Sequence, residues 1–369
     1  MKALVKTKKG VGNIELLEVE EPRPEPGWVK IEVQACGVCG TDIHIYHERS
    51  ATRPPVIMGH EFSGVVCELG QGVQNVKVGD RVVSETTVWS CGVCRYCRMG
   101  CYDICPSRWG LGRGGNGAFA RYLVMRAEML HHLPDNVDFI AGALTEPLAC
   151  CVHAATEFTQ IAAGDVVLVT GDGAIGLLTA QVAKAHGTTV VLCGLQEERL
   201  ALGRELGVDY ALNVEKEDPS ALVRRLSDGY GADVVIECSG AAQAAEMGLE
   251  LVRIRGQYTQ LGLFGGPITL DFQKVATKEL KVAGSFNQQW SSWERALRYL
   301  REGAVKTRPL VSDILPLSRW REGFEKYESR RATKVILVPE WLVGKGEVNR
   351  RGAENTEKNV AEMNRSLCV

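Results

Sequence analysis

The most constraining feature of the chain is an apolar run that ends in a glycine-rich turn and continues as a helix-like segment. Residues 164–187 read GDVVLVTGDGAIGLLTAQVAKAHG, with Gly171, Gly173 and Gly176 in the GxGxxG spacing. After a strand and before a helix, such glycines let the backbone approach a pyrophosphate at the helix N-terminus, where unpaired amides favour anions. The segment therefore predicts a dinucleotide-binding turn. The alternative is a tight strand-to-helix turn that binds no ligand.

Strand-like and helix-like segments continue to alternate after this turn. Strand-like runs follow at TTVVLCG, ADVVIECSG and GQYTQLGL, and helix-like segments stand between them at EERLALGRELG and AAQAAEMGLELVR. Such alternation is typical of right-handed βαβ units that build a parallel sheet. We therefore expect a doubly wound α/β domain over residues 154–289.

The first 150 residues follow a different pattern, with short strand-like runs such as VKIEVQACGV, EFSGVVCELG and GDRVVSETTV separated by glycine or proline. The length of 369 residues suggests about two domains, so we expect a mostly-β domain over 1–153. The helix-like SWERALRYLREGAV and the strand-like TKVILV predict a further part over 290–340 that returns to that domain. The charged stretch 341–369 is expected to be a solvated polar tail.

The charge balance argues against several classes of partner. The chain has 43 basic and 45 acidic residues and a net charge of −2, which offers no electrostatic footprint for nucleic acid or an anionic membrane. The first residues, MKALVKTKKG, lack the apolar stretch of a secretion signal, and no run of about 18 apolar residues is present. We therefore expect a cytoplasmic protein with no nucleic-acid partner and no membrane partner.

Five of the thirteen cysteines fall in one short lobe, residues 88–108. The odd total excludes complete pairing within the chain, and in the cytoplasm such a cluster is more typical of a metal site than of disulfides. Four of these thiolates can surround a zinc ion tetrahedrally and leave no open position, which describes a structural site. The expected ligands are Cys91, Cys94, Cys97 and Cys105. Cys101 can in principle replace one of them, and free thiols or local disulfides are the alternative.

A second set of possible zinc ligands is Cys39 in GVCGTDIH and His60 in GHEFSG. A catalytic zinc needs about three protein ligands and an open position, and thiolate and imidazole are suitable donors. Taken alone, Cys39 fits a small buried residue and His60 a core histidine. The sequences that surround them favour the metal site.

Over roughly residues 1–340, the chain resembles the zinc-containing medium-chain dehydrogenases. The resemblance rests on GVCGTDIH, GHEFSG, VKVGDRV, CGVCRYC with its fourth cysteine, EPLACCVHA, VTGDGAIG and GSF. Within the family the chain is most similar to the polyol (sorbitol-type) and threonine dehydrogenase branch. The resemblance implies a GroES-like catalytic domain and a Rossmann domain with the active site in the cleft between them, and a homo-oligomer of two or four chains.

The resemblance also implies the reaction. A hydride would pass between a small-molecule secondary alcohol, such as a polyol or a sugar, and NAD or NADP, with the corresponding ketone as the other partner. The alcohol would react as a zinc-bound alkoxide, because the metal lowers the pKa of the hydroxyl. Each chain would hold two zinc ions, one catalytic and one structural.

Carried over by position, Cys39 and His60 match ligands of the catalytic zinc. Glu146, in TEPLACC, stands where simple alcohol dehydrogenases have a third, cysteine ligand. This substitution is typical of the polyol branch, where the carboxylate or a water that it holds completes the shell. Glu61 either binds the metal directly or lies behind it and tunes it. The alternative for Glu146 is a plain helix start, since EPL resembles one.

Two residues match the family's proton relay. Thr41 matches the hydroxyl that accepts the proton of the alcohol, and His44 matches the outlet of the relay to solvent. The alternative for His44 is an ordinary surface histidine.

The resemblance further implies which residues contact the cofactor. They belong to the glycine-rich turn and to the ends of later strands: Gly171, Gly173, Ala174, Ile175, Gly176, Ser239, Leu261, Gly284, Ser285 and Phe286. In Rossmann folds an acidic residue at the end of the second strand accepts the ribose hydroxyls, but here that residue is Gly194. Its loss favours NADP, whereas Glu197 and Glu198 favour NAD. Arg199 fits either a phosphate ligand or an adenine-side helix residue, so the cofactor is NAD or NADP.

One departure bears on the substrate. The threonine branch usually has a functional histidine three residues before the first cysteine of the lobe, where this chain has Val88. An L-threonine-type amino-alcohol dehydrogenase is therefore the second hypothesis. A zinc-independent quinone reductase and a non-catalytic dinucleotide-binding zinc protein are the alternatives from other classes.

Overall fold

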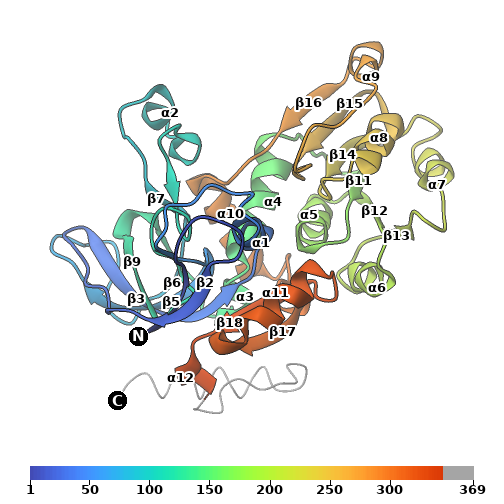
Figure 1. The fold of residues 1–369 in the computed structure, drawn as a ribbon. Helices are drawn as coiled ribbons and strands as arrows, with labels where there is room; N and C mark the ends of the chain where they lie inside the picture. The colour runs from blue at the N-terminus through green and yellow to red at the C-terminus, as the bar shows by residue number, and fades with distance from the viewer. Residues whose placement is uncertain (344–369) are drawn as a thin grey trace. The chain divides into compact units, whose positions relative to one another are not determined.

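The computed structural model describes residues 1–343 (Figure 1). The chain divides into two compact units, Pro147–Leu310 and Met1–Glu146 with the described part of Val311–Val369. The domain boundaries expected from the sequence, at 153/154 and 289/290, remain predictions. Most of the expected tail, 341–369, lies outside the described residues, and its first residues belong to the short helix α12 (Glu340–Val343).

The second unit is built on a six-stranded sheet with the order β13-β12-β11-β14-β15-β16, in which every neighbouring pair is parallel. The strands are β11 (Val166–Thr170), β12 (Thr189–Gly194), β13 (Tyr210–Asn213), β14 (Ala232–Glu237), β15 (Val252–Gln260) and β16 (Lys281–Gly284). Counted within the unit, this order is 3-2-1-4-5-6, that of the doubly wound dinucleotide-binding fold. The parallel sheet expected from the alternating segments is confirmed.

Helices alternate with these strands along the chain. They are α5 (Ala174–Ala185), α6 (Glu197–Glu205), α7 (Pro219–Leu226), α8 (Ala242–Leu251), α9 (Gln273–Thr277) and α10 (Trp290–Glu302). All five residues of the central strand β11 are buried, as its unbroken apolar run predicts for a strand covered on both faces. Helix α5 packs on β11 and β12, so the glycine-rich turn before it lies at the carboxyl end of the sheet.

Within the described residues the first unit holds three sheets. The largest has the order β10-β6-β5-β3-β18-β17, with β9 also paired to β3; the others are β2-β1-β4 and β7-β8. Its strands are β1 (Lys2–Lys6), β2 (Ile14–Glu18), β3 (Trp28–Gly37), β4 (Val56–Ile57), β5 (Glu61–Leu69), β6 (Arg81–Ser84), β7 (Thr87–Trp89), β8 (Trp109–Gly110), β9 (Tyr122–Arg126), β10 (Leu130–His132), β17 (Val311–Pro316) and β18 (Lys334–Val338). These pairs are antiparallel except for β17 with β18.

Strand β18 brings the end of the described chain into the sheet of the first unit. It pairs with β3, with Ile336 opposite Gly37 and Leu337 opposite Cys36. Helix α11 (Trp320–Glu328) packs on β17 and β18, and its Phe324 joins the core of the unit. The last strand therefore lies directly beside the segment that leads to Cys39.

Short helices complete the described chain. They are α1 (Gly40–Tyr46), α2 (Arg95–Arg98), α3 (Phe139–Gly142) and the 3₁₀ turns η1 (Tyr102–Ile104), η2 (Ala127–Met129), η3 (Arg308–Leu310) and η4 (Leu317–Arg319). The longer α4 (Thr145–Glu157) begins at the end of the first unit and continues into the second.

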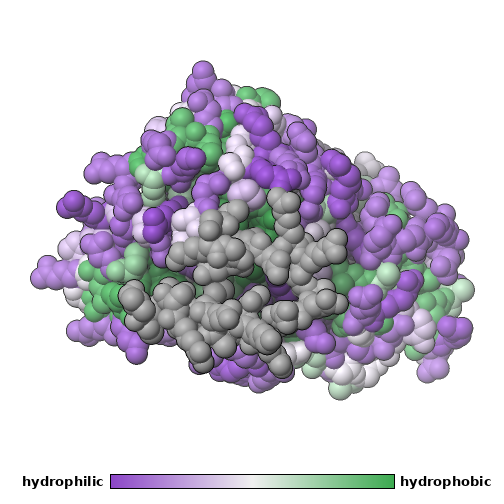
Figure 2. Space-filling model, turned by 90° about the horizontal axis from the view of Figure 1, so that it is seen from below, coloured by the Kyte–Doolittle hydropathy of each residue, from purple (hydrophilic) through white to green (hydrophobic). Residues whose placement is uncertain are grey.

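In the coloured part of Figure 2 hydrophilic residues predominate, with smaller apolar patches between them. In the described part of the chain, no helix has the length and apolar character needed to cross a membrane.

Candidate active site and metal centres

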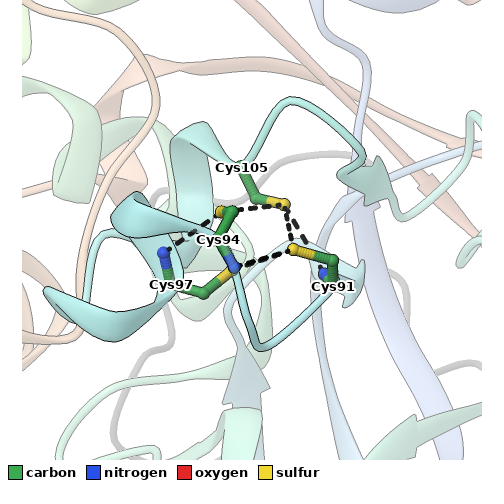
Figure 3. A group of neighbouring side chains, drawn as sticks. All are labelled: Cys91, Cys94, Cys97 and Cys105. Atoms are coloured by element: carbon green, nitrogen blue, oxygen red, sulfur yellow. Dashed lines mark hydrogen bonds between the residues drawn. The ribbon is translucent and has the colours of Figure 1, made fainter.

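Four cysteines of the lobe converge on one point (Figure 3). Cys91, Cys94, Cys97 and Cys105 have sulfur atoms that all lie within 4.8 Å of one another. Three of the separations are 3.6 Å (Cys91–Cys105), 3.9 Å (Cys94–Cys105) and 4.0 Å (Cys91–Cys97). A tetrahedron with zinc–sulfur bonds of about 2.3 Å has sulfur atoms roughly 3.8 Å apart. The lobe therefore has the dimensions of a closed four-thiolate zinc site.

The local fold of the lobe explains this convergence. Backbone amides of Cys94 and Cys97 donate to the sulfur three residues earlier, at 3.3 and 3.5 Å, because the chain turns tightly into α2. The N–H groups of Val93 and Cys94 lower the pKa of Cys91 to about 6, which favours the thiolate that binds a metal. The sulfur of Cys101 instead donates to the carbonyl of Met99 at 3.9 Å and lies outside the group, so the four expected ligands need no substitute.

A second group of possible metal ligands consists of Cys39, His60 and Glu61, whose ligand atoms also lie within 4.8 Å of one another. Glu61 opens β5 opposite Gly37 at the end of β3, and Cys39 follows Gly37 by two residues as the N-cap of α1. The pairing of two adjacent strands thus brings the three side chains together. His60 and Glu61 are buried, with 8% and 1% of their surface exposed.

The charges around His60 suit a cation. Burial lowers the pKa of His60, but the thiolate of Cys39 and the carboxylates of Asp42 and Glu146 outweigh it and raise the pKa to about 10. Anionic groups that stabilise a proton on a buried imidazole also stabilise a metal ion in its place. Glu146 lies in the first turn of α4 and is 8% exposed. It acts on His60 electrostatically but is not part of the three-residue group.

The two expected relay residues lie on one short helix. Thr41 and His44 are both in α1, which begins directly after Cys39. Residues three apart on a helix are neighbours on its surface. Thr41, close to Cys39 in the chain, is half-buried and His44 is exposed, which is the order of burial expected for a relay that ends at solvent.

The glycine-rich turn has the geometry that a dinucleotide needs. Gly171 has φ +104°, and a Cβ there would lie 2.9 Å from the amide nitrogen of Ser239. A Cβ at Gly176 would lie 1.7 Å from the carbonyl oxygen of Gly171, so the helix can pack this closely only with glycine. At Gly173, the N-cap of α5, nothing lies within 4 Å of a built Cβ, which leaves the helix N-terminus open to a ligand.

The other expected cofactor residues follow the carboxyl ends of the parallel strands, which meet at one edge of the sheet. Gly194 ends β12, Ser239 follows β14, Leu261 follows β15, and Gly284 ends β16. Ala174 and Ile175 open α5, Arg199 lies in α6, and buried Ser285 and half-exposed Phe286 follow β16. The fold thus brings together residues that are spread over more than a hundred positions of the chain.

Comparison with known proteins agrees with the two groups of possible zinc ligands and with the dinucleotide-binding turn. Residues 25–135 match the model of the alcohol dehydrogenase GroES-like domain, and residues 174–302 match that of the zinc-binding dehydrogenase domain. A sorbitol dehydrogenase of Halalkalibacterium halodurans is 49% identical over 342 residues, which cover 92% of this chain and 99% of that enzyme. The chain belongs to the zinc-containing medium-chain dehydrogenases.

Further relatives support this membership. A D-arabitol-phosphate dehydrogenase of Enterococcus avium is 38% identical, over 91% of this chain and 97% of that enzyme. The crystal structure of a putative zinc-binding dehydrogenase from Sinorhizobium meliloti bound to NADP superposes with a TM-score of 0.85 at 32% identity, covering 92% of this chain and 99% of the other. The fold class expected from the sequence, GroES-like plus Rossmann, is therefore confirmed, as are the zinc-dependent enzyme and its nicotinamide cofactor.

Sequence reasoning missed a buried lysine of this dehydrogenase. Lys334, at the start of β18, pairs with the carboxylate of Glu61, and the two side chains are only 3% and 1% exposed. Burial lowers the pKa of Lys334, but Glu61 and Cys39 outweigh it and hold the pKa above its usual value. A Cβ at Gly37 would lie 2.2 Å from Glu61 Oε2 and 3.0 Å from Lys334 Cε, so glycine is required there. The sequence feature that could have pointed to Lys334 is its position as a single lysine at the edge of the apolar run KVILV.

Asp42 is a second residue that the sequence did not single out. Its Oδ2 accepts a hydrogen bond from the backbone N–H of Cys39 at 2.9 Å, and its Oδ1 lies 3.9 Å from His60 Nδ1. Burial raises the pKa of Asp42 to about 6, while His60 opposes this rise. The carboxylate therefore fixes the turn that carries the thiol and places a negative charge close to the imidazole, as outer-shell carboxylates do in metal sites.

Proposed function

We propose that this dehydrogenase oxidises a secondary hydroxyl of a polyol or a sugar-derived alcohol to the ketone, with NAD or NADP as the hydride acceptor. The similarity to a sorbitol dehydrogenase over almost the whole of both chains carries the choice of substrate class. The carboxylate of Glu146 near His60 supports it. A carboxylate is a harder ligand than a thiolate and exchanges more readily with water, which suits a substrate with several hydroxyls.

The residues of the first unit have distinct roles in this proposal. Cys39 and His60 would hold the catalytic zinc, with Glu61 and Glu146 as direct or water-mediated ligands, and Asp42 would place a negative charge beside His60. The zinc, when bound, supplies Lewis acidity that lowers the pKa of an alcohol to near neutrality. The four cysteines of the lobe hold the second zinc, which stabilises the lobe and takes no part in the reaction.

The proton and the hydride leave the substrate by different routes. Thr41 accepts the proton of the hydroxyl and passes it along α1 to His44, whose exposure supports an outlet to solvent. The second unit holds the dinucleotide, with its pyrophosphate at Gly173 and the N-terminus of α5. The backbone at Gly284 to Phe286 would hold the carboxamide of the nicotinamide, and the dinucleotide would supply the hydride acceptor of the reaction.

An amino alcohol such as L-threonine is the competing substrate. Val88, where the threonine branch has a histidine, lies in β7 and packs on the core of the first unit. A Cβ at Gly115 would lie 2.6 Å from this side chain, so Val88 already fills the space around it. A packed valine offers no imidazole to a substrate, which favours a polyol over threonine.

We also propose a cytoplasmic location and an assembly of two or four identical chains. None of the twelve cysteines in the described part of the chain forms a disulfide, as is usual in a reducing compartment. Light scattering coupled to size-exclusion chromatography tests the assembly, and a monomeric mass would contradict it.

The test of the proposed function is a substrate screen with the purified, zinc-loaded enzyme. Polyols, phosphorylated polyols, sugars and L-threonine are each supplied with NAD and with NADP, and the absorbance of the reduced nicotinamide is followed. We expect the highest kcat/KM for a polyol or its phosphate, and loss of that activity in Cys39→Ala as the control. A higher kcat/KM for L-threonine, or no oxidation of any polyol or sugar, would contradict the proposal.

A further inference from the structure

The end of strand β12 lacks the carboxylate that usually recognises the ribose of NAD. In Rossmann domains this acidic side chain accepts a hydrogen bond from the ribose 2′-hydroxyl, and enzymes specific for NADP replace it to admit a 2′-phosphate. Here the strand ends at Gly194, which has no side chain. The choice between the two dinucleotides therefore depends on what else occupies this position.

The carboxylate of Asp172 occupies the space beside Gly194 at the end of β12. Asp172 is the second residue of the glycine-rich turn, and its Oδ2 accepts hydrogen bonds from the backbone N–H groups of Leu195 and Gln196, each at 2.7 Å. A Cβ built on Gly194 would lie 2.4 Å from this oxygen and 2.5 Å from the Cβ of Asp172. The side chain of Asp172 thus fills the space where a side chain at position 194 would begin.

The cation and the amide donors around this position already interact with Asp172. Arg199 is the cation that the sequence offers for a 2′-phosphate, and its Nη1 lies 3.9 Å from Asp172 Oδ1 in an ion pair. The amides of Leu195 and Gln196 directly follow β12, and both already donate to Asp172. A phosphate at this position would have to compete with the carboxylate for all three donors.

We infer that Asp172 replaces the missing strand-end carboxylate and makes NAD the preferred cofactor. The inference rests on the proposed function, because it names the dinucleotide that the reaction uses. Oδ2 is held by the two amides, which leaves Oδ1 to accept the ribose hydroxyl, and 12% of the side chain remains exposed for this contact. A 2′-phosphate would bring nearly two further negative charges against the same carboxylate.

The experiment measures binding without turnover. The full-length, zinc-loaded protein is titrated by calorimetry with ADP-ribose and with 2′-phospho-ADP-ribose, which lack the nicotinamide. The wild type should bind ADP-ribose more tightly. Asp172→Asn keeps the shape of the side chain and removes its charge. The affinity for ADP-ribose should therefore fall by about tenfold or more, which is the cost of losing a hydrogen bond to a charged group. Binding of 2′-phospho-ADP-ribose should strengthen in the same variant.

A double variant provides the matched control. Asp172→Gly combined with Gly194→Asp returns the carboxylate to the strand end; glycine is needed at 172 because an alanine Cβ would still lie 2.5 Å from the new one. The double variant should recover the preference for ADP-ribose, whereas Asp172→Gly alone should lose it. This comparison also serves if Asp172→Asn proves unstable.

Three results would overturn the inference. Equal weakening of both ligands in Asp172→Asn would show that Asp172 only shapes the turn. Tighter binding of 2′-phospho-ADP-ribose by the wild type would reverse the proposed preference while leaving the dehydrogenase function intact. Binding of neither ligand by the wild type would overturn the dinucleotide chemistry of the proposed function as well.

Discussion

Replacing Lys334 with methionine should destabilise the first unit strongly, because it leaves the carboxylate of Glu61 buried without its cation. The two side chains are 3% and 1% exposed, so water cannot compensate for the lost partner. Removing one member of such a buried pair costs about 3–5 kcal/mol. For a unit of this size, 1 kcal/mol corresponds to about 2–4 °C in Tm, which gives a fall of roughly 6–20 °C.

The assay is thermal unfolding followed by circular dichroism, with the zinc-loaded and the chelated protein measured side by side. The fall in Tm should be greater after chelation, because Glu61 belongs to the Cys39–His60 group and a bound cation neutralises part of its charge. Lys30→Met is the matched control in the same unit. Lys30 pairs at 3.2 Å with Glu21, whose side chain is 52% exposed, and exposed pairs contribute at most about 1 kcal/mol.

A second variant separates charge from packing. Adding Glu61→Gln to Lys334→Met removes the unpaired charge and keeps the volume, so much of the lost Tm should return in the chelated protein. A fall in Lys334→Met no larger than that in Lys30→Met would refute the reasoning. So would a double variant as unstable as Lys334→Met alone, since the cost would then lie in packing.

The remaining predictions concern the metal centres and the relay. The purified protein should hold about two zinc ions per chain. Cys39→Ala should lose one zinc and activity but keep its Tm, whereas Cys94→Ala should lose the other zinc and thermal stability. Wild-type stability of both variants would contradict the structural role of the lobe. Thr41→Ala should lower kcat by roughly a hundredfold or more, and unchanged turnover across the pH range would exclude the relay. His44→Ala should lower kcat by less than Thr41→Ala does, and mainly at low pH, because water can replace an exposed group. Glu146→Gln should lower kcat with little change in Tm, and full activity with a lower Tm would make the residue a helix start only.

The two architectures and the main chemical groups could be predicted from the sequence. The parallel sheet was predicted from apolar runs that alternate with helix-like segments, because the period of the apolar pattern reports local structure. The zinc lobe was predicted from four cysteines within 15 residues, since a short segment limits where its thiols can go. These features depend on neighbours along the chain, and a linear sequence displays them directly.

The surroundings of these groups became apparent only in the folded chain. Asp42 was overlooked because its short-range bond to Cys39 matters only once His60, from another segment, lies against it. Asp172 was assigned no role from the sequence, because its contacts depend on the parallel pairing that sets β12 beside β11.

Lys334 shows the physical reason most clearly. It is separated from Glu61 by more than 270 positions, and in the sequence it is an ordinary lysine at the edge of an apolar run. The antiparallel pairing of β18 with β3, and of β3 with β5, brings the two charges together in a buried environment. Sheet pairing between distant strands is chosen by the packing of the whole unit, so the sequence could supply the lysine but only the folded chain could supply its partner.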